Sequence, residues 1–174
     1  MDSGKNICYI TIGCSTSGKS EWCRRKQKEL GIAHFEYDRL KKDSRRNGRG
    51  MTDFLIDLVN GVDGDCAMDN VFSSPKTIKY IDERLTNHRI VLVLFDISLD
   101  ELYRHRESTT RSIMVKPRTE NYVEKIHANA ANAIQKMKCL DGFEKIIVTD
   151  DYFRDNYDES IVLKKKRKIS RTRK

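Results

Sequence analysis

A short loop near the start of the chain holds the residue types that bind nucleotide phosphates. It has the pattern Gly-x-x-x-x-Gly-Lys-Ser and comprises Gly13, Cys14, Ser15, Thr16, Ser17, Gly18, Lys19 and Ser20. Glycines allow a tight turn whose backbone N–H groups face phosphate oxygens, and a helix that follows presents its positive end to the anion. We therefore predict that the loop binds ATP, with Lys19 beside the transferred phosphoryl group and Ser20 as a ligand of Mg²⁺. The alternative, a plain glycine turn between a strand and a helix, needs neither side chain.

A carboxylate that could serve as a general base follows the second hydrophobic run of the chain. Transfer of a phosphoryl group to an alcohol is helped by a group that orients the hydroxyl and accepts its proton. Asp38 comes directly after Phe35-Glu36-Tyr37, at the end of an expected strand, and is predicted to be catalytic. Arg39 beside it is predicted to contact the acceptor. The alternative for this pair is a helix-capping aspartate followed by a solvated arginine.

Strand and helix patterns alternate along the chain in the way that builds a parallel sheet covered by helices. Expected strands lie at residues 7–12, 32–37, 66–69, 89–96 and 144–149. Expected helices lie at residues 20–30, 51–59, from 75 onward, 98–106 and 119–139. This order predicts an α/β fold of the P-loop NTPase type, a three-layer sandwich with a mostly parallel central sheet. The glycine loop then lies between the first strand and the first helix.

Three local signals support the boundaries of these helices. Gly31 is suited to the left-handed conformation that ends a helix. Ser74 followed by Pro75 is typical of a helix start, because a capping hydroxyl precedes a proline at the first helical position. Ser98 and Glu101, three residues apart, have the pattern of a capping box.

The composition fits one domain followed by a basic tail. The chain has 174 residues, 38% of them hydrophobic, and no apolar run approaches the ~20 residues of a membrane helix. Its net charge of +8 is matched by the eight basic residues of segment 164–174, so that residues 1–163 are formally neutral. We predict a P-loop kinase domain at residues 1–163 and a disordered tail at residues 164–174.

The five cysteines and the amino-terminal residues indicate a cytoplasmic protein. The cysteines are odd in number and have neither zinc-site spacing nor the density of a disulfide scaffold, so we expect free thiols. Residues 1–12 have no signal-peptide pattern, because Lys5 is followed by a short apolar stretch that runs into the glycine loop. We expect a cytoplasmic location, which is the host cytoplasm if the protein is viral, and no membrane partner.

The sequence resembles the 5′-kinase domain of bacteriophage polynucleotide kinase and related small P-loop kinases, including phage hydroxymethyluracil DNA kinases and zeta-toxin-like kinases. The likeness covers about residues 6–138. It rests on Thr-Ile-Gly-Cys-x-x-Ser-Gly-Lys-Ser at 11–20, on Asp38-Arg39, on Asp69-Asn70, and on Phe95-Asp96 followed by a helix and an arginine-bearing loop to Pro117.

The resemblance implies specific roles for residues outside the glycine loop. Asp38 would be the general base and Arg39 a contact to an acceptor phosphate. Asp69 would bind Mg²⁺ or form part of the acceptor pocket. An arginine-bearing lid would stabilise charge on the γ-phosphoryl group, with Arg106 and Arg111 preferred as catalytic residues over Arg104.

The charges that follow Asp38 suggest the class of acceptor. A basic cluster there comprises Lys41, Lys42, Arg45, Arg46 and Arg49. It favours nucleic acid as acceptor. The hydroxyl would be that of a 5′-OH end or, as the resemblance to small phage kinases implies, the hydroxymethyl group of a modified pyrimidine such as hydroxymethyluracil in phage DNA. Two alternatives stay open: a kinase of a free nucleoside, nucleotide or other small hydroxyl compound, and a non-catalytic nucleotide-dependent binding module. The sequence does not decide between DNA and RNA, nor does it give the oligomeric state.

Overall fold

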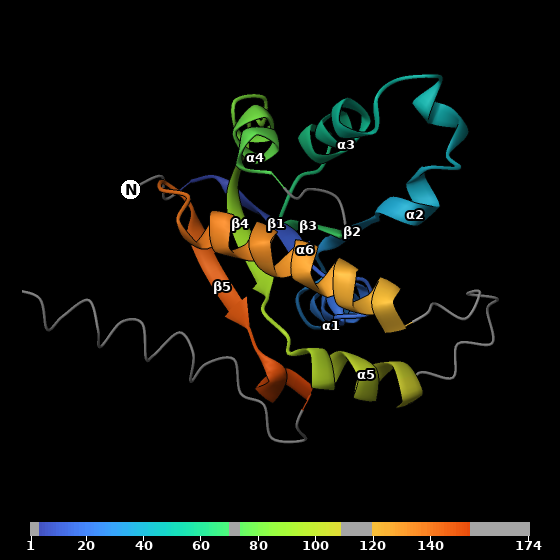
Figure 1. Cartoon of the computed structure of the whole chain (residues 1–174). Helices are drawn as coiled ribbons and strands as arrows, with labels where there is room; N and C mark the ends of the chain where they lie inside the picture. Colours follow the sequence, from blue (N-terminus) through green and yellow to red (C-terminus); the bar gives the residue numbers. More distant parts are fainter. Residues whose placement is uncertain (1–3, 70–73, 109–119, 154–174) are drawn as a thin grey trace, which may run out of the picture.

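A five-stranded parallel sheet forms the centre of the molecule (Figure 1). The computed structural model describes residues 4–69, 74–108 and 120–153. The strands are β1 (Asn6–Gly13), β2 (Ala33–Glu36), β3 (Cys66–Asp69), β4 (His88–Phe95) and β5 (Glu144–Val148). They lie in the order β2-β3-β1-β4-β5, and each neighbouring pair is parallel. The predicted α/β fold with a parallel central sheet is confirmed.

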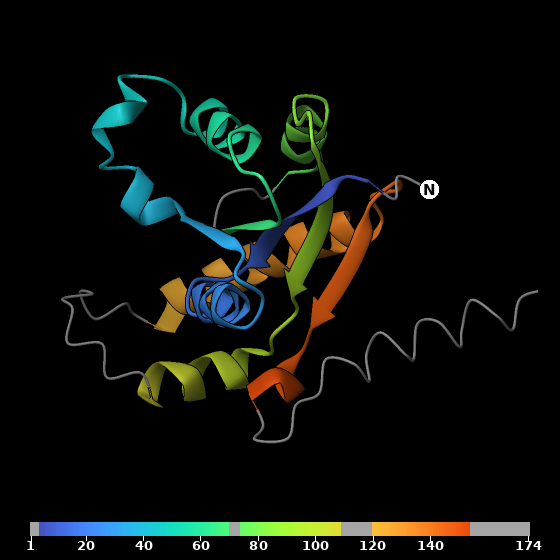
Figure 2. The ribbon, with the colours of Figure 1, turned by 180° about the vertical axis from the view of Figure 1, so that it is seen from behind.

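Helices cover both faces of this sheet, so the molecule has three layers. The helices are α1 (Lys19–Leu30), α2 (Tyr37–Leu40), α3 (Met51–Asn60), α4 (Pro75–Asp82), α5 (Leu99–Ser108) and α6 (Glu120–Lys138). One buried apolar cluster joins α3, α4 and α6 to the sheet, and a second joins α1 and α5 to the opposite face. Figure 1 shows α6 crossing in front of the sheet with α1 behind it, and Figure 2 shows the reverse. The three-layer prediction is confirmed as well.

The central strand β1 supplies side chains to both faces because successive residues of a strand point in opposite directions. Cys8, Ile10 and Ile12 belong to the cluster beneath α3, α4 and α6, and none is more than 4% exposed. On the other face, Tyr9 packs edge-on against Trp22 of α1, with ring centroids 5.6 Å apart. Full burial of large apolar side chains stabilises a fold by about 1.5–3 kcal/mol each. The sheet is therefore well stabilised on both faces, and the loops that follow its strands begin from fixed positions.

The parallel arrangement brings the carboxyl ends of the strands to one edge of the sheet. Gly13 at the end of β1 is the register partner of Phe95 in β4. Glu36 at the end of β2 is the register partner of Asp69 in β3. Open α/β sheets bind their ligands at this edge. The segments that follow these strands are therefore where a functional site is expected.

The predicted signals at the ends of α1 and α4 are confirmed. Gly31 ends α1 with φ of 68°, in the left-handed region. The Ser74 hydroxyl accepts a hydrogen bond from the Thr77 N–H at 3.1 Å, and Pro75 is the first residue of α4. These two helices therefore begin and end where local chemistry favours it.

The capping box predicted at the start of α5 is only half formed. The Ser98 hydroxyl accepts a hydrogen bond from the Glu101 N–H at 3.2 Å, as predicted. The Ser98 N–H, however, donates to the Asp150 carboxylate at 2.8 Å. The Glu101 carboxylate pairs instead with Arg104, at 2.6 Å. Asp150, which follows β5 and lies 52 positions further along the chain, thus completes the cap.

Two short helical segments between β2 and α3 were not predicted. The first is α2, where the Lys41 N–H donates to the Tyr37 carbonyl at 3.0 Å. The second is a 3₁₀ turn at Ser44–Arg46, which Asp43 caps by accepting a hydrogen bond from the Arg45 N–H at 2.9 Å. Side-chain caps of this kind order a polar stretch that has little apolar periodicity.

Several sequence predictions lie outside the described residues. They concern Arg111, Asn70 and the basic tail at residues 164–174. Arg106 lies in α5, but its side chain is not among those that the structure describes. All five cysteines are described and are free thiols, as predicted. Within the described ranges, no helix is long and apolar enough to cross a lipid bilayer.

Candidate active site

The glycine loop connects β1 to α1 at the carboxyl edge of the sheet, as predicted. A Cβ atom on Gly13 would lie 2.7 Å from the Cβ of Phe95, so a glycine is needed where β1 passes β4. Gly18 has φ of 86°, a left-handed conformation that glycine adopts without strain, and α1 begins at the next residue. The loop therefore leads into the N-terminus of α1 in the manner of a phosphate-binding site.

Lys19 is the first residue of α1, and its ammonium group lies within the loop. The residue is 5% exposed. Its Nζ donates hydrogen bonds to the carbonyls of Gly13, at 3.0 Å, and Cys14, and it lies 3.5 Å from Oγ of Ser17. Burial lowers the pKa of Lys19 to about 8, although Cys14 and Asp69 favour its charged form. A buried cation of this kind gains from a neighbouring anion more than a solvated one does.

Asp69 is the last residue of β3 and is 1% exposed. Its Oδ2 lies 3.2 Å from Nε2 of His34, and its Oδ1 accepts a hydrogen bond from the Tyr37 N–H at 3.1 Å. Burial would raise the pKa of Asp69, but the hydrogen bonds from His34, Ser20 and Tyr37 outweigh it and hold the pKa below its usual value. The carboxylate is therefore ionised at neutral pH, beside the glycine loop.

Ser20 and Asp69 have the chemistry of a Mg²⁺ site. Magnesium takes oxygen ligands, often one or two from the protein and the rest from substrate phosphates and water. The Ser20 hydroxyl and the ionised carboxylate of Asp69, whose pKa Ser20 helps to lower, offer such ligands beside the glycine loop. Across residues 4–69, 74–108 and 120–153, no group of three or more His, Cys, Asp or Glu side chains could hold a metal ion. A metal here would therefore depend on nucleotide phosphates for further ligands.

His34 is a site residue that the sequence analysis missed. It lies in β2, its side chain is 5% exposed, and it hydrogen-bonds to Asp69 on the neighbouring strand. A histidine inside a short apolar run was an available signal, because a buried polar side chain needs a partner. The partner itself was hidden, since Asp69 is 35 positions further along the chain.

Asp38 and Arg39 lie in α2, just beyond the end of β2. Both are exposed, and the Asp38 side chain is 73% exposed, with its Oδ1 3.4 Å from Nζ of Lys41. The connection of this turn to the buried site runs through the backbone N–H of Tyr37, which donates to Asp69. The structure thus places Tyr37, the first residue of α2, in contact with Asp69 of the buried site. The roles of Asp38 and Arg39 stay predictions.

Much of the basic cluster is paired with carboxylates of the same region. The pairs are Lys41 with Asp38, Arg45 with Asp43 at 2.6 Å, and Arg49 with Asp57. Exposed pairs contribute only about 0–1 kcal/mol to stability. They nevertheless reduce the positive charge that the cluster offers to a phosphate backbone.

Of the three arginines predicted for the lid, the structure describes the side chain of Arg104 alone. Arg104 lies in α5, and its side chain is 74% exposed and paired with Glu101 at 2.6 Å. The side chain of Arg106 and the whole of Arg111 lie outside what the structure describes. The predicted lid and its catalytic arginines therefore stay predictions.

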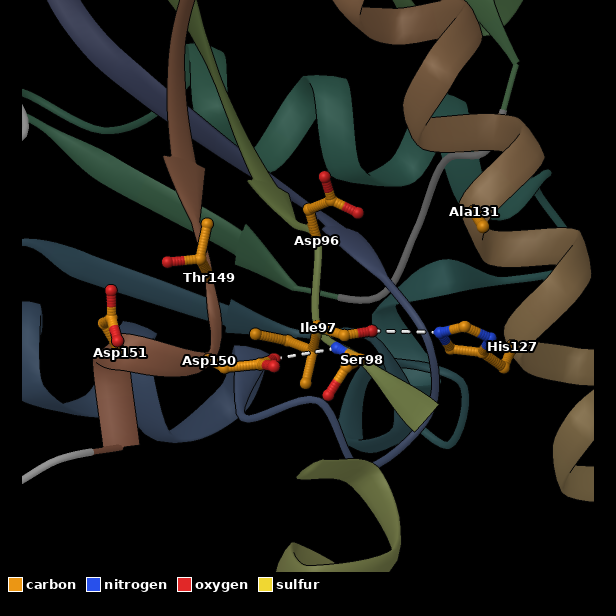
Figure 3. A pocket seen from close by; sticks show the side chains of 8 residues that line it. All are labelled: Asp96, Ile97, Ser98, His127, Ala131, Thr149, Asp150 and Asp151. Atoms are coloured by element: carbon orange, nitrogen blue, oxygen red, sulfur yellow. Dashed lines mark hydrogen bonds between the residues drawn. The ribbon is translucent and has the colours of Figure 1, made fainter. Parts of the chain in front are cut away.

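A cavity of about 460 Å³ lies at the carboxyl ends of β4 and β5 (Figure 3). The polar residues that line it are Asp96, Ser98, His127, Thr149, Asp150 and Asp151. Nε2 of His127 donates to the carbonyl of Ile97 at 3.0 Å, which fixes the segment after β4 against α6. Of its three carboxylates, Asp96 is paired with Lys138 at 2.6 Å, but the acidic side chains of Asp150 and Asp151 still make the cavity unfavourable for phosphate groups. Phosphates are therefore expected at the glycine loop and not in this cavity.

The strand order, the glycine loop after β1 and the acidic end of β3 together give the fold of the small P-loop kinases. Three solved structures with similar folds are a candidate kinase from Chloroflexus aurantiacus J-10-fl, shikimate kinase from Bacteroides thetaiotaomicron and deoxyadenosine kinase from M. mycoides. Their TM-scores are 0.61, 0.57 and 0.53, with sequence identities of 11%, 10% and 13%. The alignments cover 98%, 95% and 93% of this chain, and 98%, 98% and 99% of the respective structures.

Identities this low show a common fold and nothing more specific. No protein-family model matches the chain, and no curated protein matches its sequence. The comparisons give no support to the narrower resemblance to bacteriophage polynucleotide kinase, hydroxymethyluracil DNA kinases or zeta-toxin-like kinases.

Proposed function

We propose that the protein is a kinase that transfers the γ-phosphoryl group of ATP to a hydroxyl group of a small molecule. The observation that carries this proposal is the buried ammonium group of Lys19 inside the glycine loop, 3.0 Å from the Gly13 carbonyl, together with the buried carboxylate of Asp69 at the end of the neighbouring strand β3. A glycine turn that merely joins a strand to a helix requires neither the buried lysine nor the buried carboxylate. The kinases that share the fold are consistent with the proposal.

The residues of the buried site would bind and polarise the triphosphate. The backbone N–H groups of residues 14–18 and Nζ of Lys19 would hold the β- and γ-phosphates. Mg²⁺, held by Ser20 and Asp69, would neutralise charge on the transferred group. Because Asp69 is already buried and hydrogen-bonded, this carboxylate needs little reorganisation when the nucleotide and metal bind.

Asp38 is the proposed general base. An exposed carboxylate at the carboxyl end of β2 can reach a hydroxyl that approaches from solvent, and Lys41 beside it would have to move aside. Arg39 would contact the acceptor, and Arg106 and Arg111 would stabilise charge on the phosphoryl group. The oxygen of the acceptor then bonds to phosphorus, ADP leaves, and the hydroxyl proton passes to Asp38.

A small acceptor is favoured over nucleic acid because of the charges around Asp38. Lys41, Arg45 and Arg49 are paired with acids, so these three residues offer less positive charge to a polymer backbone than their number suggests. The similar structures whose names specify a substrate are kinases of shikimate and deoxyadenosine. Both names point to small hydroxyl compounds as the first acceptors to test.

A panel of acceptors tests the proposal. The protein would be incubated with γ-labelled ATP, Mg²⁺ and, separately, free nucleosides, shikimate, simple sugars, a 5′-OH oligonucleotide and hydroxymethylated duplex DNA. We expect label on a small acceptor and none with a Lys19→Met control. Label on the oligonucleotide or the duplex would assign a nucleic-acid acceptor instead. Tight ATP binding without transfer to any acceptor would favour a non-catalytic binding module.

A further inference from the structure

We propose that His34 is a positioning residue of this active site, which holds Asp69 in the orientation that receives Mg²⁺ and ties the acceptor turn to the same carboxylate. This inference rests on the proposed kinase function. His34 belongs to no nucleotide-binding motif and lies in the edge strand β2. Its role follows from its hydrogen bond to Asp69.

The two oxygens of Asp69 have different donors from one strand and the turn that follows it. His34 contacts Oδ2 at 3.2 Å, and the Tyr37 N–H contacts Oδ1 at 3.1 Å. Rotation of the carboxylate would stretch both hydrogen bonds at once. The plane of the carboxylate is therefore set by donors from β2 and α2.

The direction of the His34 hydrogen bond follows from the ionisation of Asp69. An ionised carboxylate only accepts hydrogen bonds, so Nε2 of His34 must carry the proton. The two side chains are 5% and 2% exposed, so solvent cannot readily replace this donor if it is removed. Hydrogen-bond partners of metal ligands orient those ligands and affect metal affinity in the same way.

The same carboxylate joins the phosphate side of the site to the acceptor side. Tyr37 donates to Asp69 through its backbone, and the next residue is Asp38, the proposed general base. If His34 no longer holds Asp69, the carboxylate can turn away from Tyr37 as well as from the metal. Loss of His34 should therefore weaken the metal site and loosen the turn that carries Asp38.

The competing explanation is that His34 and Asp69 only fasten β2 to β3. In that case removal of His34 would lower stability without changing the response to metal. His88 provides a matched control, because it is a histidine of β4 that is 2% exposed, with Nε2 2.9 Å from the carbonyl of Gly64. It lies at the amino end of its strand, away from the glycine loop.

The experiment measures the affinity for ADP with and without Mg²⁺ by calorimetry, together with hydrogen exchange of the Tyr37 amide. In His34→Leu, we expect the gain in ADP affinity due to Mg²⁺ to fall by about 10-fold to 100-fold, while binding of ADP alone stays within about threefold. Exchange at Tyr37 should become faster by about tenfold or more. His88→Leu should match the wild type in both measurements.

A conservative pair of variants keeps the test decisive if His34→Leu does not fold. Glutamine places its amide nitrogen near the position of Nε2, whereas asparagine places it nearer the position of Nδ1. His34→Gln should therefore retain the Mg²⁺ response to within a few-fold, and His34→Asn should lose it.

The outcomes separate this inference from the proposed function. A metal response and a Tyr37 exchange rate that survive in His34→Leu, or in His34→Asn where leucine does not fold, would show a purely structural role and overturn the inference alone. Equal losses in His34→Leu and His88→Leu would overturn it too. If Mg²⁺ does not change the ADP affinity of the wild-type protein, the proposed function is wrong, and this inference fails with it.

Discussion

On the phosphate side of the site, Lys19 and Asp69 are 5% and 1% exposed and are held by several hydrogen bonds each. On the acceptor side, Asp38 is 73% exposed, and the contact it makes is an ion pair with the exposed Lys41. The two sides are joined at Tyr37, whose N–H reaches Asp69. One region is thus fixed by burial, whereas the other is a solvated turn.

This difference separates what the fold fixes from what it leaves adjustable. Buried charges must be satisfied by neighbours, so the phosphate side cannot rearrange without losing those contacts. Exposed ion pairs are weak, so the acceptor turn can change its partners at little cost. The groups expected to bind the triphosphate, Lys19 and Asp69, are therefore fixed in the core. The choice of acceptor would depend on the exposed turn around Asp38, whose contacts can change.

The largest effect is expected when the buried cation of the phosphate side is removed. Lys19→Met keeps much of the side-chain length but none of the charge, and we expect turnover to fall by about 10³-fold. Lys28→Met, in the last turn of the same helix, should leave turnover unchanged. Steady-state ADP formation with the preferred acceptor measures both. Similar losses in the two variants would show that helix stability, and not the charge in the loop, is responsible.

The second effect concerns the base on the acceptor side. Asp38→Asn removes the proton acceptor but no buried contact, so kcat should fall by about 10²-fold while ADP affinity stays within about twofold. Asp43→Asn, an acid of the same region that pairs with Arg45, is the matched control and should retain its kcat. If ADP affinity falls along with kcat, Asp38 belongs to the phosphate side, and the acceptor turn is not separate from it.

A smaller effect is expected from pH. Bound phosphates should raise the pKa of Lys19 from about 8, so nucleotide binding takes up a proton at high pH. Without Mg²⁺, ADP affinity should be highest below pH 8 and should fall by up to about tenfold per pH unit above it. Calorimetry across this range provides the measurement. A Lys19→Met profile as steep as that of the wild type would assign the dependence to another group.

Without nucleotide, the stability of the protein should rise with pH in the range where ADP affinity falls. The pKa of Lys19 in the folded state, about 8, lies below its ordinary value of 10.5. The unfolded state therefore binds more protons at this residue between these two values, and its contribution to the free energy of unfolding rises with pH there. Urea denaturation of the wild type and Lys19→Met would show the difference, and a contribution that falls with pH would contradict the burial argument.

The smallest effect is expected from the basic cluster. Arg45→Gln and Arg49→Gln each break an exposed pair, so stability should change by less than about 1 kcal/mol and turnover of a small acceptor by less than about twofold. Increasing salt should likewise have little influence on the KM of a neutral acceptor. A large loss in either variant, or a steep salt dependence, would mean that the cluster contacts the acceptor directly.

The sequence was most informative where structure depends on local pattern. The glycine loop, the apolar run of β4 and the start of α4 each follow from residues that are adjacent in the chain. The fold class followed from the alternation of such elements. Even the roles of Lys19 and Ser20 could be suggested, because a single short motif fixes their position relative to the turn.

The rest depended on which strands become neighbours. The contact between His34 and Asp69 requires β2 and β3 to be adjacent in the sheet, and the polar pattern alone does not reveal that pairing. Asp69 itself had been suggested by a family resemblance and not by its local surroundings. The pair between Arg49 and Asp57 also joins separate segments, so the sequence overstated the free positive charge of the basic cluster.

A crystal structure of the protein with ADP and Mg²⁺ tests the central claim most directly. The account predicts that Nζ of Lys19 contacts a phosphate oxygen, that Ser20 Oγ is a metal ligand, and that Asp69 binds the metal directly or through one water molecule. A nucleotide bound away from residues 13–20, or a metal ion that neither Ser20 nor Asp69 approaches, would contradict it.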